Sequence, residues 1–279
     1  STPKPSSAAS DVYKRQLTKA VTKIVSWNVN SIRVRLPHLL ELIDTVQPEI
    51  ILLQETKTED STFPKDEIEN KGYQIIINGQ KSYNGVAILS KLPLELVIDH
   101  LPGNNDDTQA RYLEAKILID NPITVSSIYL PNGNPVDTDK FPYKLDWMDR
   151  LYTHVKKKII NCETFLLGGD YNIIPTAEDA VDISKWHKDA LHHPESLKRY
   201  RNLMNLGLTD SLKSFNSKPY EFTYWDYSRG SWEKDIGLRI DHLLASPFAA
   251  DRLIDCQVEK RFRSLERPSD HVPIWCQIN

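Results

Sequence analysis

The sequence predicts a single α/β domain, and three observations lead to this prediction. Short apolar runs typical of buried strands, such as residues 24–27 and 50–53, alternate along the chain with segments of helical spacing, such as 33–46. No polar linker interrupts the chain after residue 22. Of the 279 residues, 40% are hydrophobic and 26% are charged, which is an ordinary globular composition and allows a sizeable core.

The first 22 residues differ from the rest, because they begin with Pro, Ser and Ala and show no apolar period. They also lack the apolar core of a secretory signal. We therefore expect a disordered N-terminal extension over residues 1–22 and a single domain over residues 23–279. No stretch approaches the ~20 apolar residues of a membrane helix, so no membrane association is expected.

Charge and cysteine content restrict the class of protein. The formal net charge is −3, which argues against a protein that only coats nucleic acid. An acidic chain can still bind a polyanion if its carboxylates hold cations and its basic residues gather on one face. The odd number of cysteines, without a CxxC pair, favours a reducing compartment, and we expect a cytoplasmic protein.

Helical spacing of apolar residues and the apolar or alternating runs typical of strands predict the remaining elements in order. Helix 33–46 places six apolar residues at helical spacing, and Pro48 ends it. Apolar runs and alternating segments predict further strands at 73–78, 85–90, 94–98, 112–119, 123–129, 164–167, 239–245, 254–260 and 273–278. Helical spacing predicts further helices at 138–160 and 194–206.

Side chains that carry oxygen ligands gather where the predicted strands end. An Asp or Asn at such a place is usually a turn residue or a helix cap, but six such ends are harder to explain as turns. Hard oxygen ligands with no cysteine and few histidines suit Mg²⁺ or Mn²⁺ better than zinc. The phosphate loop of nucleotide-binding proteins and the GxSxG elbow are both missing from the sequence. The candidate side chains are Asn28, Asn30, Gln54, Glu55, Tyr129, Asn132, Asp170, Asn172, Asp241, Asp270 and His271.

Six short motifs in order make the chain similar to the exonuclease III family of the endonuclease/exonuclease/phosphatase superfamily. They are SWNVNSIR at 26–33, LQETK at 53–57, YLPNG at 129–133, GGDYNI at 168–173, GLRIDH at 237–242 and SDHVP at 269–273. The resemblance covers about residues 23–279. It implies a four-layered α/β sandwich of the deoxyribonuclease I type, with two mixed β-sheets flanked by helices. It also implies a Mg²⁺-dependent 3′→5′ exonuclease on double-stranded DNA that nicks abasic-site DNA and has 3′-phosphatase and 3′-repair diesterase activity.

The resemblance also implies roles for individual residues. Glu55, joined by Asp270, would bind the metal, and Asp170 would orient and deprotonate the attacking water. Alternatively Asp170, Asn172 and His271 would hold a second metal, and this choice stays open. The side-chain amides of Asn28 and Asn172 would hold the attacking water, a metal ion or Asp170 in place. His271 would face the scissile phosphate with its tautomer fixed by Asp241, unless Asp241 simply pairs with Arg239. Tyr129 and Asn132 would bind phosphate.

Two positions depart from the animal abasic endonucleases and point to the bacterial branch, with stronger exonuclease activity. Asn30 stands where the animal enzymes carry Asp, and Leu238 stands where they carry Trp. The pocket for an extrahelical abasic sugar would then be Tyr224, Leu238 and Ile240, while Trp225 is expected in the core. Basic side chains expected to contact DNA phosphates include Arg33, Lys57, Arg111 and Arg239, with Asn30 beside them.

Two other functions compete with a DNA-repair nuclease. One is another phosphoesterase of the same superfold, such as a sphingomyelinase or an inositol phosphatase, and the GLRID and YxPNG motifs oppose it. The other is a catalytically inactive DNA-binding relative, although every expected catalytic position is filled. We expect a monomer.

Overall fold

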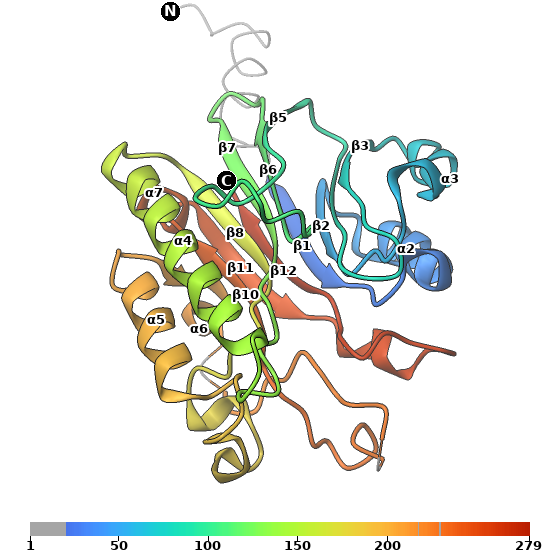
Figure 1. Ribbon diagram of the computed structural model, residues 1–279. Helices are drawn as coiled ribbons and strands as arrows, with labels where there is room; N and C mark the ends of the chain where they lie inside the picture. The colour runs from blue at the N-terminus through green and yellow to red at the C-terminus, as the bar shows by residue number, and fades with distance from the viewer. Residues whose placement is uncertain (1–20, 217, 229) are drawn as a thin grey trace, which may run out of the picture.

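Two six-stranded sheets packed face to face form the centre of the protein. The computed structural model describes residues 21–279 apart from residues 217 and 229. One sheet has the strand order β11-β12-β1-β2-β4-β3, and the other has the order β5-β6-β7-β8-β10-β9 (Figure 1). The strands of the first sheet are β1 (Thr22–Asn28), β2 (Ile50–Gln54), β3 (Gln74–Asn78), β4 (Val86–Ser90), β11 (Leu253–Val258) and β12 (Ile274–Ile278). Those of the second are β5 (Leu94–Ile98), β6 (Tyr112–Ile117), β7 (Ile123–Tyr129), β8 (Phe165–Asp170), β9 (Thr209–Asp210) and β10 (Asp241–Ala245).

Each sheet contains one parallel pair at its centre and antiparallel pairs around it. β1 pairs with β2 in parallel, and β7 pairs with β8 in parallel. Parallel neighbours end at the same edge of a sheet, so the loops that follow these four strands meet. These carboxyl ends lie at the lower end of the molecule in Figure 1.

The core between the sheets follows from the alternation of side chains along each strand. In β2, Ile50 and Leu52 point to the other sheet, while Ile51 and Leu53 point outward under a helix. A Cβ at Gly168 in β8 would lie 2.6 Å from Leu52 Cδ1 of the facing sheet, so the glycine leaves room for the two sheets to pack at this point.

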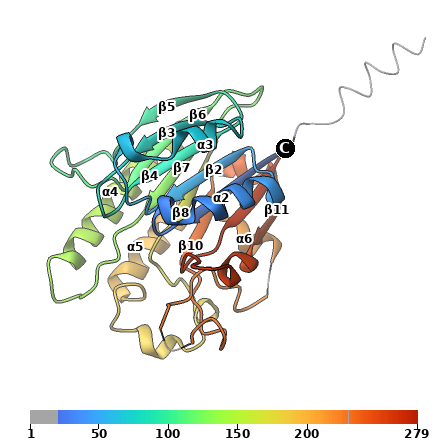
Figure 2. The same ribbon diagram turned by 90° about the vertical axis from the view of Figure 1, so that its right-hand side faces the viewer.

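Helices cover the outer faces of both sheets. α2 (Ile32–Val46) packs Leu39, Leu42 and Ile43 on the first sheet (Figure 2). α4 (Lys140–Ile160) and α5 (Pro194–Met204) cover the second sheet. The short helices are α3 (Lys65–Glu69), α6 (Ser211–Phe215) and α7 (Pro247–Ala250). Among residues 21–279 without 217 and 229, no helix has the length and apolar character needed to cross a membrane.

The architecture confirms the predicted four-layered α/β sandwich. Most predicted elements are present with shifts of a few residues: the strand predicted at 239–245 begins at Asp241, and the helix predicted at 138–160 begins at Lys140. α3, α6, α7 and the two-residue strand β9 were not predicted, because they are too short to show a period. β1 begins at Thr22, one residue before the predicted domain boundary. Residues 1–20 of the predicted extension lie outside the described residues.

Candidate active site

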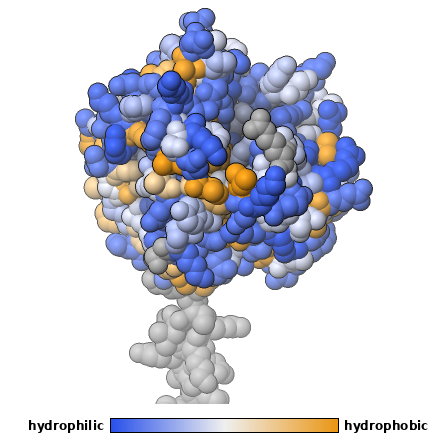
Figure 3. All heavy atoms as spheres, turned by 90° about the horizontal axis from the view of Figure 1, so that it is seen from below, coloured by the Kyte–Doolittle hydropathy of each residue, from blue (hydrophilic) through white to orange (hydrophobic). Residues whose placement is uncertain are grey.

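The loops that follow β2, β7 and β8, together with the segments around Tyr224, Leu238 and His271, line a cavity of about 220 Å³. Figure 3 views this end of the molecule, whose surface is mostly hydrophilic and carries a short apolar band. Ten of the predicted site residues line the cavity, together with three neighbours that were not predicted. The lining residues are Glu55, Tyr129, Asn132, Asn134, Asp170, Asn172, Trp186, Leu191, Tyr224, Leu238, Ile240, Asp270 and His271.

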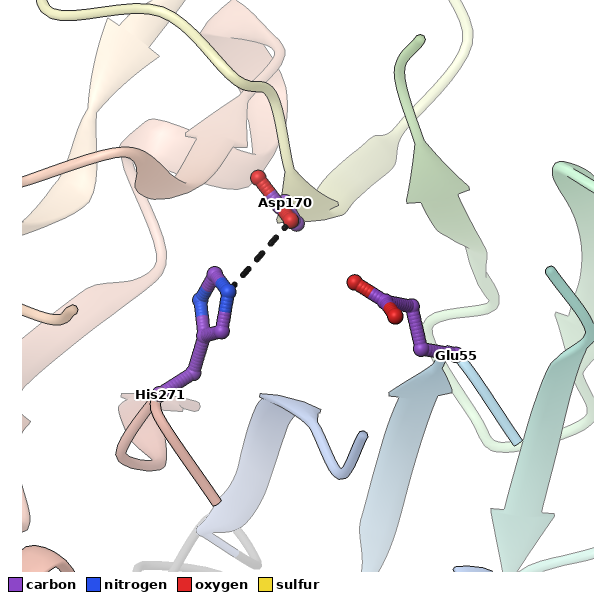
Figure 4. Close-up of side chains that lie close together, drawn as sticks. All are labelled: Glu55, Asp170 and His271. Carbon is purple, nitrogen blue, oxygen red and sulfur yellow. Dashed lines mark ion pairs between the residues drawn. The ribbon is translucent and has the colours of Figure 1, made fainter. Parts of the chain in front are cut away.

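Glu55, Asp170 and His271 form the polar centre of the cavity. They come from the end of β2, the end of β8 and the loop before β12, and their ligand atoms all lie within 4.8 Å of one another. Figure 4 shows the Glu55 carboxylate pointing toward Asp170, with the imidazole of His271 on the other side at 3.7 Å from Asp170 Oδ2. The fold therefore brings together residues that are far apart in the chain.

Asp170 is buried and held from two sides. Its Oδ1 accepts the backbone N–H of Asn172 at 2.9 Å, and its Oδ2 accepts Nδ2 of Asn28 at 3.0 Å. Burial raises the pKa of Asp170, and the nearby carboxylates of Asp241 and Glu55 raise it further, against the opposing effect of His271. A carboxylate whose pKa is raised toward neutrality suits proton transfer better than an ordinary surface acid.

His271 is fixed by Asp241. Its Nδ1 lies 2.9 Å from Asp241 Oδ2, and Thr223 Oγ1 donates to the same oxygen at 2.6 Å. Burial alone would lower the pKa of His271, but the charges of Asp241 and Asp170 outweigh it and raise that pKa above its usual value. The imidazole thus presents Nε2 to the cavity while Asp241 stabilises its protonated form. Asp241 therefore pairs with His271 and not with Arg239.

Glu55 occupies an unusual backbone conformation at φ 50°. Left-handed conformations cost of order 1–3 kcal/mol for such residues and are often retained at functional sites. Its Oε1 accepts Nδ2 of Asn28 at 2.7 Å, and its Oε2 lies 2.8 Å from Lys57 Nζ. Burial would raise the pKa of Glu55, but Lys57 and Asn28 lower it, so the carboxylate is ionised.

The donor set fits a hard divalent cation. Two carboxylates and one imidazole lie close enough to share an ion, and Asp270 and Asn172 add oxygen atoms to the wall of the same cavity. Asn172 Oδ1 also accepts Asn132 Nδ2 at 3.0 Å. Asp270 Oδ1 accepts Nδ2 of Asn30 at 3.0 Å, which ties this acid to the loop after β1.

Of the three roles expected for Asn28, the structure shows the contact with Asp170, whereas its amide is not oriented as a metal ligand. Its Oδ1 accepts the backbone N–H of Asn30 at 3.0 Å, so the nitrogen Nδ2 faces the cavity. That nitrogen contacts Glu55, Asp170 and His271 Nε2. An amide N–H donor cannot coordinate a cation, and Asn28 instead donates to the carboxylates of Glu55 and Asp170 and so holds them together.

Arg239 is not a DNA contact, which corrects a second expectation. Only 2% of its surface is exposed, and its guanidinium donates to Asp179 at 2.6 Å and to Asp210 at 2.7 Å. A buried arginine that satisfies two buried carboxylates stabilises the fold behind the site and cannot reach a phosphate. The motif position of Arg239 therefore has a structural role.

Replacing Arg239 with Met is expected to destabilise the protein by about 3–5 kcal/mol, because Asp179 and Asp210 would lose their compensating charge. Urea unfolding of the two proteins measures this loss. Cleavage rates per folded molecule should stay near the wild-type value. A selective rise in KM for DNA with unchanged stability would instead restore Arg239 as a DNA contact.

Of the other predicted DNA-facing residues, Asn132 lines the cavity, and Arg111 and Lys57 contact residues that line it. Arg111 stacks over the ring of Tyr129 at 4.7 Å, and Asn132 is exposed at the rim. Lys57 is half-buried, and its Nζ donates to Asn30 Oδ1 at 2.6 Å in addition to its contact with Glu55. Arg33 is exposed in the first turn of α2. For Tyr129, burial and then the negative charges of Glu55 and Asp170 raise the pKa, so its phenol keeps its proton.

An apolar wall closes one side of the cavity. Leu238 and Ile240 are buried, Tyr224 is half-buried, and the rings of Tyr224 and His271 lie 4.9 Å apart. Trp225 is fully buried, which confirms that it belongs to the core. Trp186 and Leu191 complete the wall but were not predicted, since they lie outside any of the six motifs. Asn134 and Thr223 were also missed, because they lie just outside the motifs. Their position next to Gly133 and Tyr224 is the only signal in the sequence that could have pointed to them.

Comparisons with known proteins agree with this geometry. The sequence pattern of the Endonuclease/Exonuclease/phosphatase family matches residues 25–271. An exodeoxyribonuclease III from Haemophilus influenzae is 34% identical over 92% of this chain and 99% of its own length. The structure of a 3′ phosphatase, NExo, from Neisseria bound to a product DNA hairpin superposes with a TM-score of 0.87 and 36% identity, covering 92% of this chain and 99% of that one.

A third relative extends the comparison to abasic-site enzymes. An AP endonuclease from Archaeoglobus fulgidus superposes with a TM-score of 0.87 and 33% identity, again over 92% of this chain and 99% of its own. These matches confirm the resemblance that the six motifs indicate. The chain belongs to the endonuclease/exonuclease/phosphatase family, and its relatives within it include exodeoxyribonuclease III and AP endonucleases.

Proposed function

We propose that this protein is a Mg²⁺-dependent DNA-repair nuclease. It would act as a 3′→5′ exonuclease on double-stranded DNA and as an abasic-site endonuclease, with 3′-phosphatase and 3′-phosphodiesterase activity. The observation that carries the proposal is the cluster of Glu55, Asp170 and His271, with Asp241 behind the imidazole, beside an apolar wall. The names of the relatives described above indicate that those proteins act on phosphodiester or phosphate groups of DNA.

The chain's own residues supply most of what phosphodiester hydrolysis requires. Asp170 lies at the end of a rigid strand and can take a proton from an attacking water. The protonated His271 can donate Nε2–H to a non-bridging phosphate oxygen, because Asp241 occupies its Nδ1. Tyr129 and Asn132 can donate to the phosphate from the other side of the cavity.

A divalent cation would be held by Glu55 and Asp270, with Asn172 nearby. When bound, such a cation neutralises charge that develops on the phosphate oxygens during hydrolysis. Manganese could replace magnesium, because both accept carboxylate and amide oxygens. A second cation held by Asp170, Asn172 and His271 is the alternative to a general-base role of Asp170. The dependence of the cleavage rate on Mg²⁺ concentration distinguishes one metal site from two.

One gel assay tests the proposed function. A duplex with a single abasic site, a 3′-phosphate duplex and an unmodified blunt duplex are each incubated with Mg²⁺, with Mn²⁺ and with EDTA. We expect cleavage of all three with either metal and none with EDTA. Hydrolysis of a sphingomyelin or inositol phosphate substrate without DNA cleavage would show another phosphoesterase of the same fold. Binding of DNA without hydrolysis would show an inactive relative.

The surroundings of the enzyme follow from the same proposal. Its substrates would be double-stranded and abasic-site DNA, and we therefore propose that it works in the cytoplasm, associated with the nucleoid. We also propose that it is a monomer. The exposed Cys162 and the buried Cys256 and Cys276 are free thiols, as suits a reducing compartment. Gel filtration coupled to light scattering measures the oligomeric state.

The Leu238→Ala variant is expected to slow abasic-site incision more than 3′-phosphate removal. An abasic nucleotide is easily extruded from the stack, and a tight apolar wall excludes a nucleotide that still carries its base. Loss of the Leu238 side chain removes packing worth roughly 1–3 kcal/mol if it is fully buried against the sugar. Both rates are measured on matched duplexes. An equal loss in both would mean that Leu238 only packs the core.

A further inference from the structure

Lys144 lies in the second turn of α4, beneath the floor of the candidate active site, and its side chain is fully buried. Its Nζ donates to the backbone carbonyl of Asn172 at 2.6 Å and to that of Asn132 at 3.1 Å. The first carbonyl belongs to the loop after β8 and the second to the loop after β7. One side chain thus joins the two catalytic loops from below.

The two loops that Lys144 joins also contact each other through the side chains that face the cavity. Asn132 Nδ2 donates to Asn172 Oδ1 at 3.0 Å, and Asn172 Nδ2 donates to the carbonyl of Leu130 at 3.0 Å. The backbone N–H of Asn172 donates to Asp170 Oδ1 at 2.9 Å. Asn172 itself has φ 47°, a left-handed conformation that asparagine adopts more readily than most residues.

The packing around Lys144 leaves it little freedom. Gly133, at φ +86°, lies directly on the lysine stem, so that a Cβ at this position would come within 2.6 Å of Lys144 Cδ and 3.2 Å of its Cβ. The glycine allows the loop after β7 to pass over the lysine. Because the stem is confined in this way, Nζ has a defined position relative to both carbonyls.

We propose that Lys144 is a positioning residue that sets the relative placement of Asn132, Asn172 and, through Asn172, Asp170. The inference rests on the proposed function, in which these side chains contact the phosphate, the metal or the attacking water. A lysine suits the task because its long side chain reaches from a helix to two loops and offers several donors without an acceptor. Displacement of catalytic groups by about 1 Å can cost on the order of 10²-fold in rate.

Lys158 provides a matched control on the same helix. It is also buried, but its Nζ contacts Glu114 at 2.6 Å and Glu163 at 2.9 Å, and none of these residues lines the candidate active site. Removing Lys158 leaves a buried carboxylate without its cation, so Lys158→Met is expected to be at least as destabilising as Lys144→Met. A purely structural role for Lys144 would make the two variants behave alike.

The test compares the wild-type protein with Lys144→Met, Lys144→Gln and Lys158→Met, with rates expressed per folded molecule. We expect kcat to fall by about 10²-fold in Lys144→Met with less than about a threefold change in KM, a partial recovery in Lys144→Gln, and a near-normal kcat in Lys158→Met. A wild-type kcat in Lys144→Met, or equal losses in both Met variants, would overturn the proposal.

A second measurement separates failure of this inference from failure of the proposed function. The side-chain amide signals of Asn132 and Asn172, assigned by NMR from single substitutions, should shift in Lys144→Met and stay in place in Lys158→Met. This readout needs neither DNA nor metal. Inactive wild-type protein would refute the proposed function, whereas unshifted amide signals would refute the positioning role. If Lys144→Met does not fold, the same measurements are made on Gly133→Ala, which keeps the lysine but presses on its stem.

Discussion

Asp170→Asn is expected to reduce turnover by about 10²- to 10⁴-fold while DNA binding survives. The amide oxygen can still accept the backbone N–H of Asn172, the contact with Asn28 Nδ2 is lost, and the amide cannot take a proton from water. Binding to a polyanion should not weaken, because the substitution removes a negative charge from the site. Single-turnover cleavage and equilibrium binding of an abasic-site duplex measure the two quantities separately.

The control for this experiment is Asp251→Asn, an exposed acid at the end of α7 that does not line the cavity. It should cleave at the wild-type rate. If binding and cleavage by Asp170→Asn fall together by the same factor, Asp170 positions DNA and another group activates the water.

Glu55→Ala is expected to abolish cleavage supported by Mg²⁺, with a loss of ~10²-fold or more. The substitution removes the anionic group that is ionised in the cavity and leaves Asn28 and Lys57 facing an empty space. The Mg²⁺ concentration needed for half-maximal activity should rise as well, because Asp270 is the main oxygen ligand that remains. Initial rates over a range of Mg²⁺ concentrations measure both effects.

Glu59→Ala supplies the matched control, since Glu59 is an exposed acid in the same loop and does not line the cavity. Its activity and its Mg²⁺ dependence should match those of the wild type. Wild-type activity in Glu55→Ala would refute the assignment of Glu55 to the metal.

The strands and long helices could be predicted because their signal is local. Four apolar residues in a row at 50–53 indicate a strand buried on both faces, and β2 is buried along its whole length. The helix ending before Pro48 follows from a rule that involves adjacent residues only. α6 was missed because it depends on one capping contact, in which Asp210 accepts the N–H of Lys213. Five residues are too few for a period to appear.

The sequence alone determined the family, the fold class and the kind of chemistry, because each motif is a short run whose residues stand next to one another in the chain. Only the tertiary structure decided which way those residues point. Asn28 contacts Asp170 across 142 positions and His271 across 243, so its role as a donor depends on how the two sheets pack.

The same reason explains why Arg239 and Lys144 could not be assigned from the sequence. The sequence does not show which basic residues are buried or what they contact. Arg239 is paired with Asp179 and Asp210 from other segments, and Lys144 contacts two loops that pack against its helix. Local patterns extend over about 15 residues, whereas burial and charge pairing are set by elements that meet only after the chain has folded.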